Sequence, residues 1–151
     1  MFDTLAYFTL TFYKDFSKYT AEKLQELDVN YGSLFFILYV GVHPGCTPSE
    51  LTRVLEVDWG HSQRSISKLV KDGLITKEKK GRTYRLNLTK KGHQVFQVCH
   101  QVFFDWDEKR LSILTEEEQR ELFRLVWKLF PEENRRERDK KTLLQYGEFS
   151  S

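Results

Sequence analysis

Apolar residues recur at helical spacing along most of the chain, which predicts a mainly α-helical protein. Between residue 3 and about residue 27 they follow one helix face, and no glycine or proline interrupts it. The strongly apolar stretch that follows predicts a second helix, with Asn30 as its N-cap and Pro44 and Gly45 as its stop. A further apolar stripe over residues 90–111 predicts another long helix.

Capping signals place two short helices in the middle of the chain. Thr47 and Glu50 have the spacing of a capping box, with a proline between them in the first turn, and predict a helix over residues 48–55. Asp58 is placed to cap a helix over residues 59–72, which the next glycine ends. A tight pair of helices is therefore expected here.

Two short strands and one more helix complete the pattern. The segments "LITKEK" and "TYRLNL" favour a β-hairpin with its turn around Lys80-Gly81. A second capping box, Thr115 with Glu118, opens an amphipathic helix that stops at Pro131.

This order of elements is typical of a winged helix-turn-helix protein. The expected fold class is mainly α with a small β-hairpin wing (α+β), in a single domain over residues 1–151. We expect the winged helix-turn-helix at 30–92, dimerisation helices at 1–29 and 93–131, and a charged tail at 132–151. The flanking helices are expected to pair two chains, because their apolar stripes are broader than so small a core can cover.

Positive charge is concentrated in one part of the chain. The segment between Trp59 and His93 contains ten basic residues and two acidic ones, which gives it a net charge of +8. Because the whole chain carries +2, the remainder carries −6. Such asymmetry indicates a surface that meets a polyanion.

The basic region coincides with the two elements that would touch DNA. A winged helix-turn-helix places its second helix in the major groove, where arginine can read guanine and glutamine can read adenine. Its wing meets phosphates or enters the minor groove. The expected DNA-binding residues are Trp59, His61, Gln63, Arg64, Lys68, Lys79, Lys80, Arg82 and Arg85. Two alternatives stay open: the basic surface could bind nothing, and Trp59 could pack against the wing or the preceding helix.

Nothing in the sequence indicates an enzyme or a cofactor. It contains no glycine-rich phosphate loop, no nucleophile elbow and no grouped His, Asp and Ser residues. Cys46 and Cys99 lie far apart, as is typical of reduced thiols. The N-terminus lacks the basic region of a signal peptide, and no apolar run is as long as a membrane span. We therefore expect a soluble cytoplasmic protein that does not contact membranes.

The sequence resembles the MarR family of bacterial transcription regulators from about Leu27 to Gly92. The resemblance is carried by "NYGSLFFILYVGVHPGCT", "PSELTRVLEV", "SISKLVKDGLI" and "LNLTKKG", and the frame "GLI … LTKKG" around the wing is its most specific part. It implies a homodimer on a pseudo-palindromic operator, usually a repressor that a small ligand, a metal or an oxidant releases. The wing "KKGRTYR" is shorter than is typical of the family, with Arg82 at the place of a family arginine and Lys80 at that of an aspartate.

The sequence contains candidate residues for three kinds of regulatory signal: a hydrophobic ligand, a metal ion and an oxidant. Aromatic residues at helical spacing could line a site for a hydrophobic effector, with Phe12, Phe16, Phe35 and Tyr39 as its candidates, although we favour a role in the core and the dimer interface. His43, Cys46, His93, Cys99 and His100 do not make a compact metal site, so no metal ligand is assigned. Peroxide sensing would need an exposed, acidic thiol. Cys99 lies on an apolar stripe, whereas Cys46 could gain thiolate character from the helix that follows it.

The favoured function is a sequence-specific, dimeric DNA-binding repressor released by a small ligand or another signal. The alternative is a winged-helix protein-interaction module that has lost operator binding and holds an acidic partner on its wing.

Overall fold

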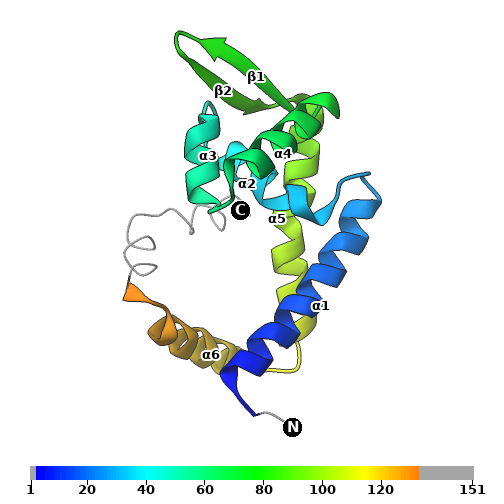
Figure 1. Cartoon of the computed structure of the whole chain (residues 1–151). Helices are drawn as coiled ribbons and strands as arrows, with labels where there is room; N and C mark the ends of the chain where they lie inside the picture. The colour runs from blue at the N-terminus through cyan, green and yellow to red at the C-terminus, as the bar shows by residue number, and fades with distance from the viewer. Residues whose placement is uncertain (1–2, 133–151) are drawn as a thin grey trace. The chain divides into compact units, whose positions relative to one another are not determined.

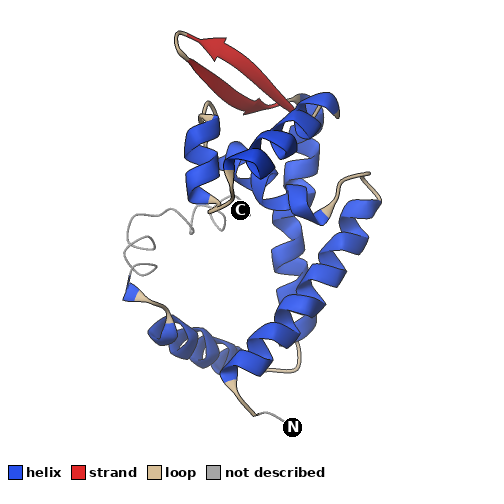
Figure 2. Cartoon of the chain, in the orientation of Figure 1, coloured by secondary structure: helices blue, strands red, loops and turns tan. Residues whose placement is uncertain are grey.

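A computed structural model of the chain describes residues 3–132, which form two compact units, residues 3–103 and 104–132. Figures 1 and 2 show the helices and the single hairpin. The elements are α1 (Leu5–Gln25), the 3-10 turn η1 (Tyr31–Ser33), α2 (Leu34–Val42), α3 (Pro48–Val54), α4 (Trp59–Lys71), β1 (Ile75–Lys80), β2 (Thr83–Leu88), α5 (Lys90–Leu111) and α6 (Glu116–Leu129). The predicted fold class is confirmed. Apart from Glu132, the predicted tail lies outside the described residues.

Three of the predicted helix caps, at Thr47, Asp58 and Thr115, form as the sequence indicated. The carboxylate of Asp58 accepts a hydrogen bond at 2.8 Å from the backbone N–H three residues on, at the start of α4. Both capping boxes, Thr47 with Glu50 and Thr115 with Glu118, close in both directions. None of the described helices is both long and apolar enough to cross a membrane.

Asn30 caps a different element from the one predicted. Its side chain accepts hydrogen bonds from the backbone N–H and the hydroxyl of Ser33, at 3.0 and 3.1 Å. These bonds close the short 3-10 turn η1, and α2 begins only after it. Such turns are common at the N-termini of α-helices.

The core of the larger unit is formed by α2, α3, α4 and the hairpin, together with buried side chains of α1 and α5 such as Leu24 and Cys99. Its fully buried side chains include Leu34, Ile37 and Val40 of α2, Leu51 of α3, Ile66 and Leu69 of α4, and Leu86 of β2. Because α4 buries only the face that carries its core residues, its other face is left to solvent.

The frame around the wing joins the end of α4 to the start of α5. The hydroxyl of Thr89 donates to the carbonyl of Gly73 at 2.6 Å and accepts from the N–H of Gly92 at 2.9 Å. A Cβ on Gly92 would overlap the carbonyl oxygen of Leu74, so only glycine permits this approach. These contacts fix both ends of the hairpin.

The hairpin is a two-stranded antiparallel sheet with a two-residue turn. Its last pair is Lys80 opposite Thr83, and the turn begins at Gly81 with φ +63°. A positive φ at this position suits a type II′ turn, which matches the twist of the strands. The N–H of Gly45 donates to the carbonyl of Leu86 at 2.8 Å, which anchors the hairpin to the loop between α2 and α3.

Helix α6 belongs to the smaller unit and buries none of its residues. Its apolar side chains Leu122, Leu125, Val126 and Leu129 follow one face at helical spacing and are each more than a third exposed. This well-capped amphipathic helix therefore exposes an apolar face within the described part of its own unit.

Candidate nucleic-acid interface

The turn between α3 and α4 sets how the second helix is presented. Glu56, in this turn, adopts a positive φ of 53°, an uncommon conformation for a residue other than glycine. The hydroxyls of Thr52 in α3 and Ser62 in α4 lie 2.6 Å apart and join the helices. Since Ser62 is fully buried, the opposite face of α4 points outward.

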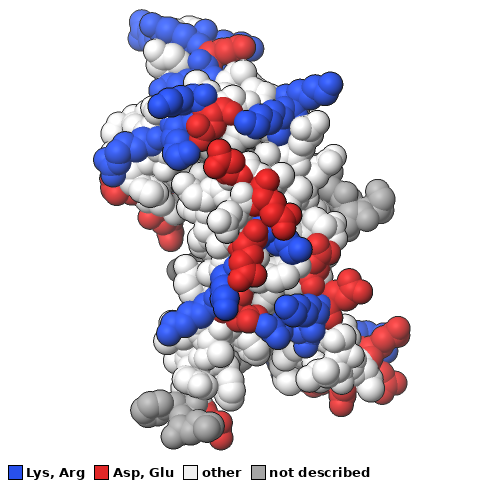
Figure 3. All heavy atoms as spheres, turned by 90° about the vertical axis from the view of Figure 1, so that its right-hand side faces the viewer, with Lys and Arg blue, Asp and Glu red and all other residues white. Residues whose placement is uncertain are grey.

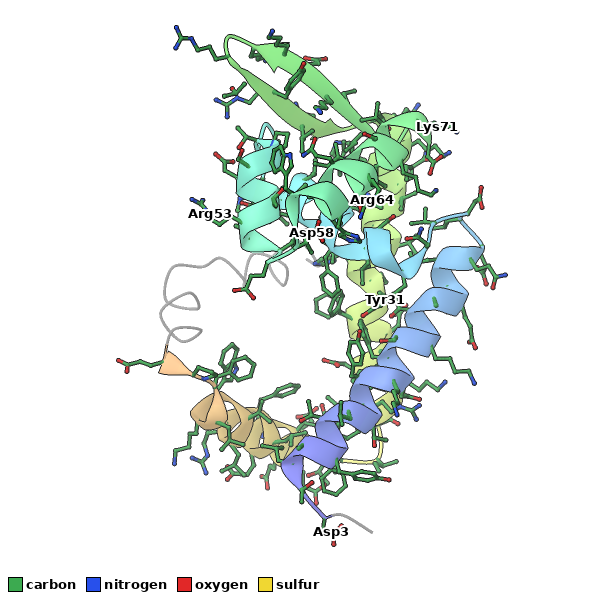
Figure 4. All side chains as sticks on the ribbon, viewed as in Figure 1. Asp3, Tyr31, Arg53, Asp58, Arg64 and Lys71 are labelled. Carbon is green, nitrogen blue, oxygen red and sulfur yellow. The ribbon has the colours of Figure 1, made fainter. Side chains whose placement is uncertain are left out.

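The outward face of α4 is polar and positively charged. Its exposed residues include His61, Arg64 and Lys68, as predicted, together with Ser67 and Lys71. Figure 4 labels Arg64 and Lys71 on this helix. Lys71 was not among the predicted residues, although its place two helical turns after Arg64 could have revealed it.

Trp59 occupies the first position of α4 and is 55% exposed. The alternative in which it packs against the wing or the preceding helix does not fit so large an exposure. An indole at the start of the second helix is available to whatever α4 meets.

Gln63 is more buried than the predicted contact with a base requires. Its side chain is half-buried, and its amide nitrogen is fully buried with no hydrogen-bond partner. Two-point recognition of adenine needs both ends of the carboxamide. Gln63 cannot make that contact in this conformation, because it precedes Ile66 by one turn and flanks the buried face of α4.

Lys68 is exposed but has an acidic partner on its own helix. Its ammonium lies 2.7 Å from the carboxylate of Asp72. This hydrogen bond and charge raise the pKa of Lys68 and lower the pKa of Asp72. Part of the positive charge predicted for DNA at Lys68 is therefore balanced within α4.

The tip of the hairpin carries exposed cations that have no acidic partner among the described residues. Lys79, Lys80 and Arg82 are all exposed. In Figure 3, Lys and Arg side chains gather at the end of the displayed face that holds the hairpin. Arg85 differs from the prediction, because it is half-buried and its guanidinium donates to the carbonyl of Gly45 at 3.1 Å. The structure thus uses Arg85, at least in part, to hold the wing in place.

The aromatic residues predicted to bind an effector have different surroundings. Phe16 contacts Phe103 with ring centroids 5.0 Å apart, and Phe35 contacts Tyr31 at 6.3 Å. Tyr39 stacks on His43 at 4.4 Å, and Phe12 is 52% exposed.

The thiols and histidines do not form a reactive or metal-binding centre in the part of the chain that is described. Burial raises the pKa of Cys99 to about 12. Burial, reinforced by the Glu50 carboxylate, raises the pKa of Cys46 to about 11. The expected thiolate character of Cys46 is wrong, because desolvation outweighs any influence of the next helix. Within residues 3–132, no group of three His, Cys, Asp or Glu side chains is arranged to hold a metal ion.

The folded chain should resist alkylation of both cysteines. At pH 8, three units below its pKa, about one Cys46 in a thousand is a thiolate. Iodoacetamide should therefore label neither cysteine in the time that labels both in guanidinium, as read by mass spectrometry. Rapid labelling of Cys46 in the folded protein would contradict this expectation.

Comparisons with known proteins show which family this chain resembles. A family model described as a winged helix DNA-binding domain matches residues 35–92. The HTH-type transcriptional regulator BilQ of Clostridium symbiosum is 41% identical over 132 residues, which cover 85% of this chain and 92% of the relative.

Two solved structures show the same fold. The apo form of wild-type MarR from E. coli is 26% identical with a TM-score of 0.71, covering 87% of this chain and 99% of that one. A putative MarR family regulator from Listeria monocytogenes, solved with a 26-mer DNA, is 22% identical with a TM-score of 0.69, covering 85% and 87%.

The fold, the matched domain and the relatives agree. The matched domain at residues 35–92 contains α3, α4 and the hairpin, and most of the chain aligns with a transcriptional regulator. The resemblance noted in the sequence is thereby confirmed. This chain belongs to the MarR family of winged-helix transcriptional regulators, and it is a DNA-binding regulator rather than an enzyme.

Proposed function

We propose that the chain is a homodimeric repressor that binds a pseudo-palindromic, double-stranded operator. In each half-site α4 would lie in the major groove and the hairpin would follow the neighbouring backbone. The observation that carries the proposal is that one unit exposes both the cationic face of α4 and the cationic hairpin tip. A bound dimer would repress by occupying DNA that RNA polymerase needs, and it would act in the cytoplasm beside the chromosome.

The proposed residue roles follow the observed placement. His61 and Arg64, with Trp59 beside them, are exposed at the N-terminal part of α4, where side chains reach base edges. Lys79, Lys80 and Arg82 would contact phosphates. Lys68 and Arg85 have smaller roles in this proposal, because each already has an internal partner.

Two chains are proposed to pair through α1, α5 and α6. Besides the α6 stripe, α1 exposes Leu5, Phe8 and Phe12, and α5 exposes Phe103 and Phe104, each by at least 37%. Monomeric proteins rarely leave so many large apolar side chains uncovered. A second copy of the chain is the partner we propose, since symmetric dimers are the commonest soluble assemblies.

Release from DNA is proposed to follow binding of a small hydrophobic or aromatic effector. Phe12 and Phe35 offer exposed ring surface, 52% and 43%, and Phe16 and Tyr39 complete the proposed set. Because a dimer interface would use the same kind of surface, we still favour the packing role for these rings. A rise in melting temperature with added salicylate, as a representative aromatic ligand, together with loss of operator binding, would support the effector role.

The proposed function is tested by selecting genomic fragments that bind the protein and measuring their affinity by fluorescence anisotropy. The expected result is much tighter binding to the selected fragment than to a random duplex of equal length. Equal affinity for the two duplexes, or no binding to either, would reject the operator and favour an acidic protein partner for the wing.

Replacing Arg64 by alanine should weaken operator binding and relax sequence choice. A guanidinium that reads guanine is worth about 1–3 kcal/mol, so the loss should fall mainly on the operator and not on random DNA. Lys80→Ala is the matched control, because a phosphate contact carries no sequence information and its loss weakens both duplexes alike. An equal loss on both duplexes for the Arg64 variant would show that Arg64 contacts only the backbone.

A further inference from the structure

The first turn of α4 contains a glycine, Gly60, beneath the side chain of Arg64. Gly60 is exposed and lies on the outward face of the helix. A Cβ at this position would lie 3.2 Å from Nη1 of Arg64 and 3.3 Å from Oδ1 of Asp58. Helical side chains point toward the N-terminus of their helix. The guanidinium of Arg64 accordingly reaches back one turn, over Gly60, toward the capping residue (Figure 4).

Asp58 supplies negative charge at this end of the helix. Its carboxylate accepts the N–H of His61 at 2.8 Å, and this hydrogen bond is the main cause that lowers the pKa of Asp58. The positive charge of Arg64 lowers that pKa further. The carboxylate is therefore ionised at neutral pH, and it attracts the guanidinium that extends toward it.

Helix stability does not explain a glycine at position 60. The position has no positive φ, and glycine is a poorer helix former than alanine. A residue that opposes local stability often serves function. The space that a side chain at position 60 would need is bordered by two groups, the end of the Arg64 side chain and the Asp58 carboxylate.

We propose that Gly60 is a positioning residue for sequence recognition: its missing side chain lets the Arg64 guanidinium lie over the first turn of α4, beside the Asp58 carboxylate. A long side chain held in one region loses less rotamer freedom when it contacts a base. This inference rests on the proposed function, in which α4 enters the major groove. It assigns part of the specificity to a residue that has no side chain of its own.

A double-mutant cycle tests whether Gly60 acts through Arg64. Gly60→Leu should lower the ratio of operator to random-DNA affinity by about tenfold, similar to Arg64→Ala, because both remove one base contact. The double variant should lose no more than Arg64→Ala alone, because the two changes remove the same interaction. Gly60→Ala should have a smaller effect on this ratio and a higher melting temperature, since alanine favours the helix. Circular dichroism checks that every variant is folded.

A measurement without DNA separates positioning from simple obstruction. The pKa of the Asp58 carboxyl, followed by NMR, should rise in Arg64→Ala and equally in Gly60→Leu, because both take the guanidinium away. Ser67→Leu is the matched control, since it places the same side chain on the exposed face of α4 two turns further on and should leave that pKa unchanged.

The possible outcomes are distinct. If Gly60→Leu still weakens operator binding in the Arg64→Ala background, Gly60 acts by direct approach to DNA and the inference is overturned. It is also overturned if Gly60→Leu leaves the Asp58 pKa or the affinity ratio unchanged while the wild type prefers its operator. A wild type with no preference for any operator would instead reject the proposed function, and this inference with it.

Discussion

Replacing Leu125 and Leu129 together by glutamate should dissociate the proposed dimer and weaken operator binding by about 100-fold or more. The two side chains are 45% and 64% exposed on the apolar face of α6. Both hydrogen bonds of the capping box at the start of this helix are formed. Burying a leucine against a second chain is worth roughly 1.5–3 kcal/mol, whereas burying an unpaired carboxylate is strongly unfavourable. A monomer would contact one half-site alone and lose the gain of a second, tethered contact.

Sedimentation equilibrium at micromolar concentration and anisotropy on the selected operator measure the two effects. Arg120→Ala/Lys128→Ala is the matched control, because it changes the charge of α6 by the same amount and both residues are exposed on that helix. The control should stay dimeric. A Leu125/Leu129 variant that sediments as a dimer would show that α6 is not part of the interface.

Replacing Lys79, Lys80 and Arg82 together by alanine should flatten the salt dependence of DNA binding. These three side chains are exposed at the hairpin tip, whereas Lys77 lies 4.6 Å from the Tyr84 ring centre and Arg85 donates to Gly45. Each neutralised phosphate contributes about 0.9 to the slope of log K against log salt. With three side chains in each half of a dimer, the slope should fall by about two to five units if most of them touch phosphate.

The control for this variant is Lys14→Ala/Lys18→Ala/Lys23→Ala in α1. It removes the same charge from exposed positions on an element that is not expected to touch DNA. Anisotropy titrations between low and physiological salt should show a nearly unchanged slope for the control. Equal slopes for the wing variant and the wild type would mean that the hairpin does not lie on DNA.

Local features of the fold could be read from the sequence alone. The caps at Asp58, Thr47 and Thr115 each depend on a hydrogen bond between residues three positions apart, so neighbouring residue types are enough to predict them. The hairpin turn likewise requires only a glycine able to take a positive φ. The basic region was also visible, because charge adds along the sequence before any folding is considered.

Contacts between distant segments decided which of the predicted site residues are exposed and which are buried. Arg85 is held by the carbonyl of Gly45, 40 residues away. Gln63 turned out half-buried, and Cys46 is desolvated by the packing around the hairpin base. A helix period divides a surface into inner and outer faces, but it does not show how far a neighbouring element covers the boundary between them.

The sequence by itself therefore determined the order of the main helices and strands, the caps at Asp58, Thr47 and Thr115, and the positive charge between Trp59 and His93, because each depends on residues close together in the chain. Only the tertiary structure decided that Arg85 anchors the wing, that Gln63 is half-buried, and that Cys46 is buried. These properties arise from packing in three dimensions, where the position of one segment sets the burial and the hydrogen-bond partners of another.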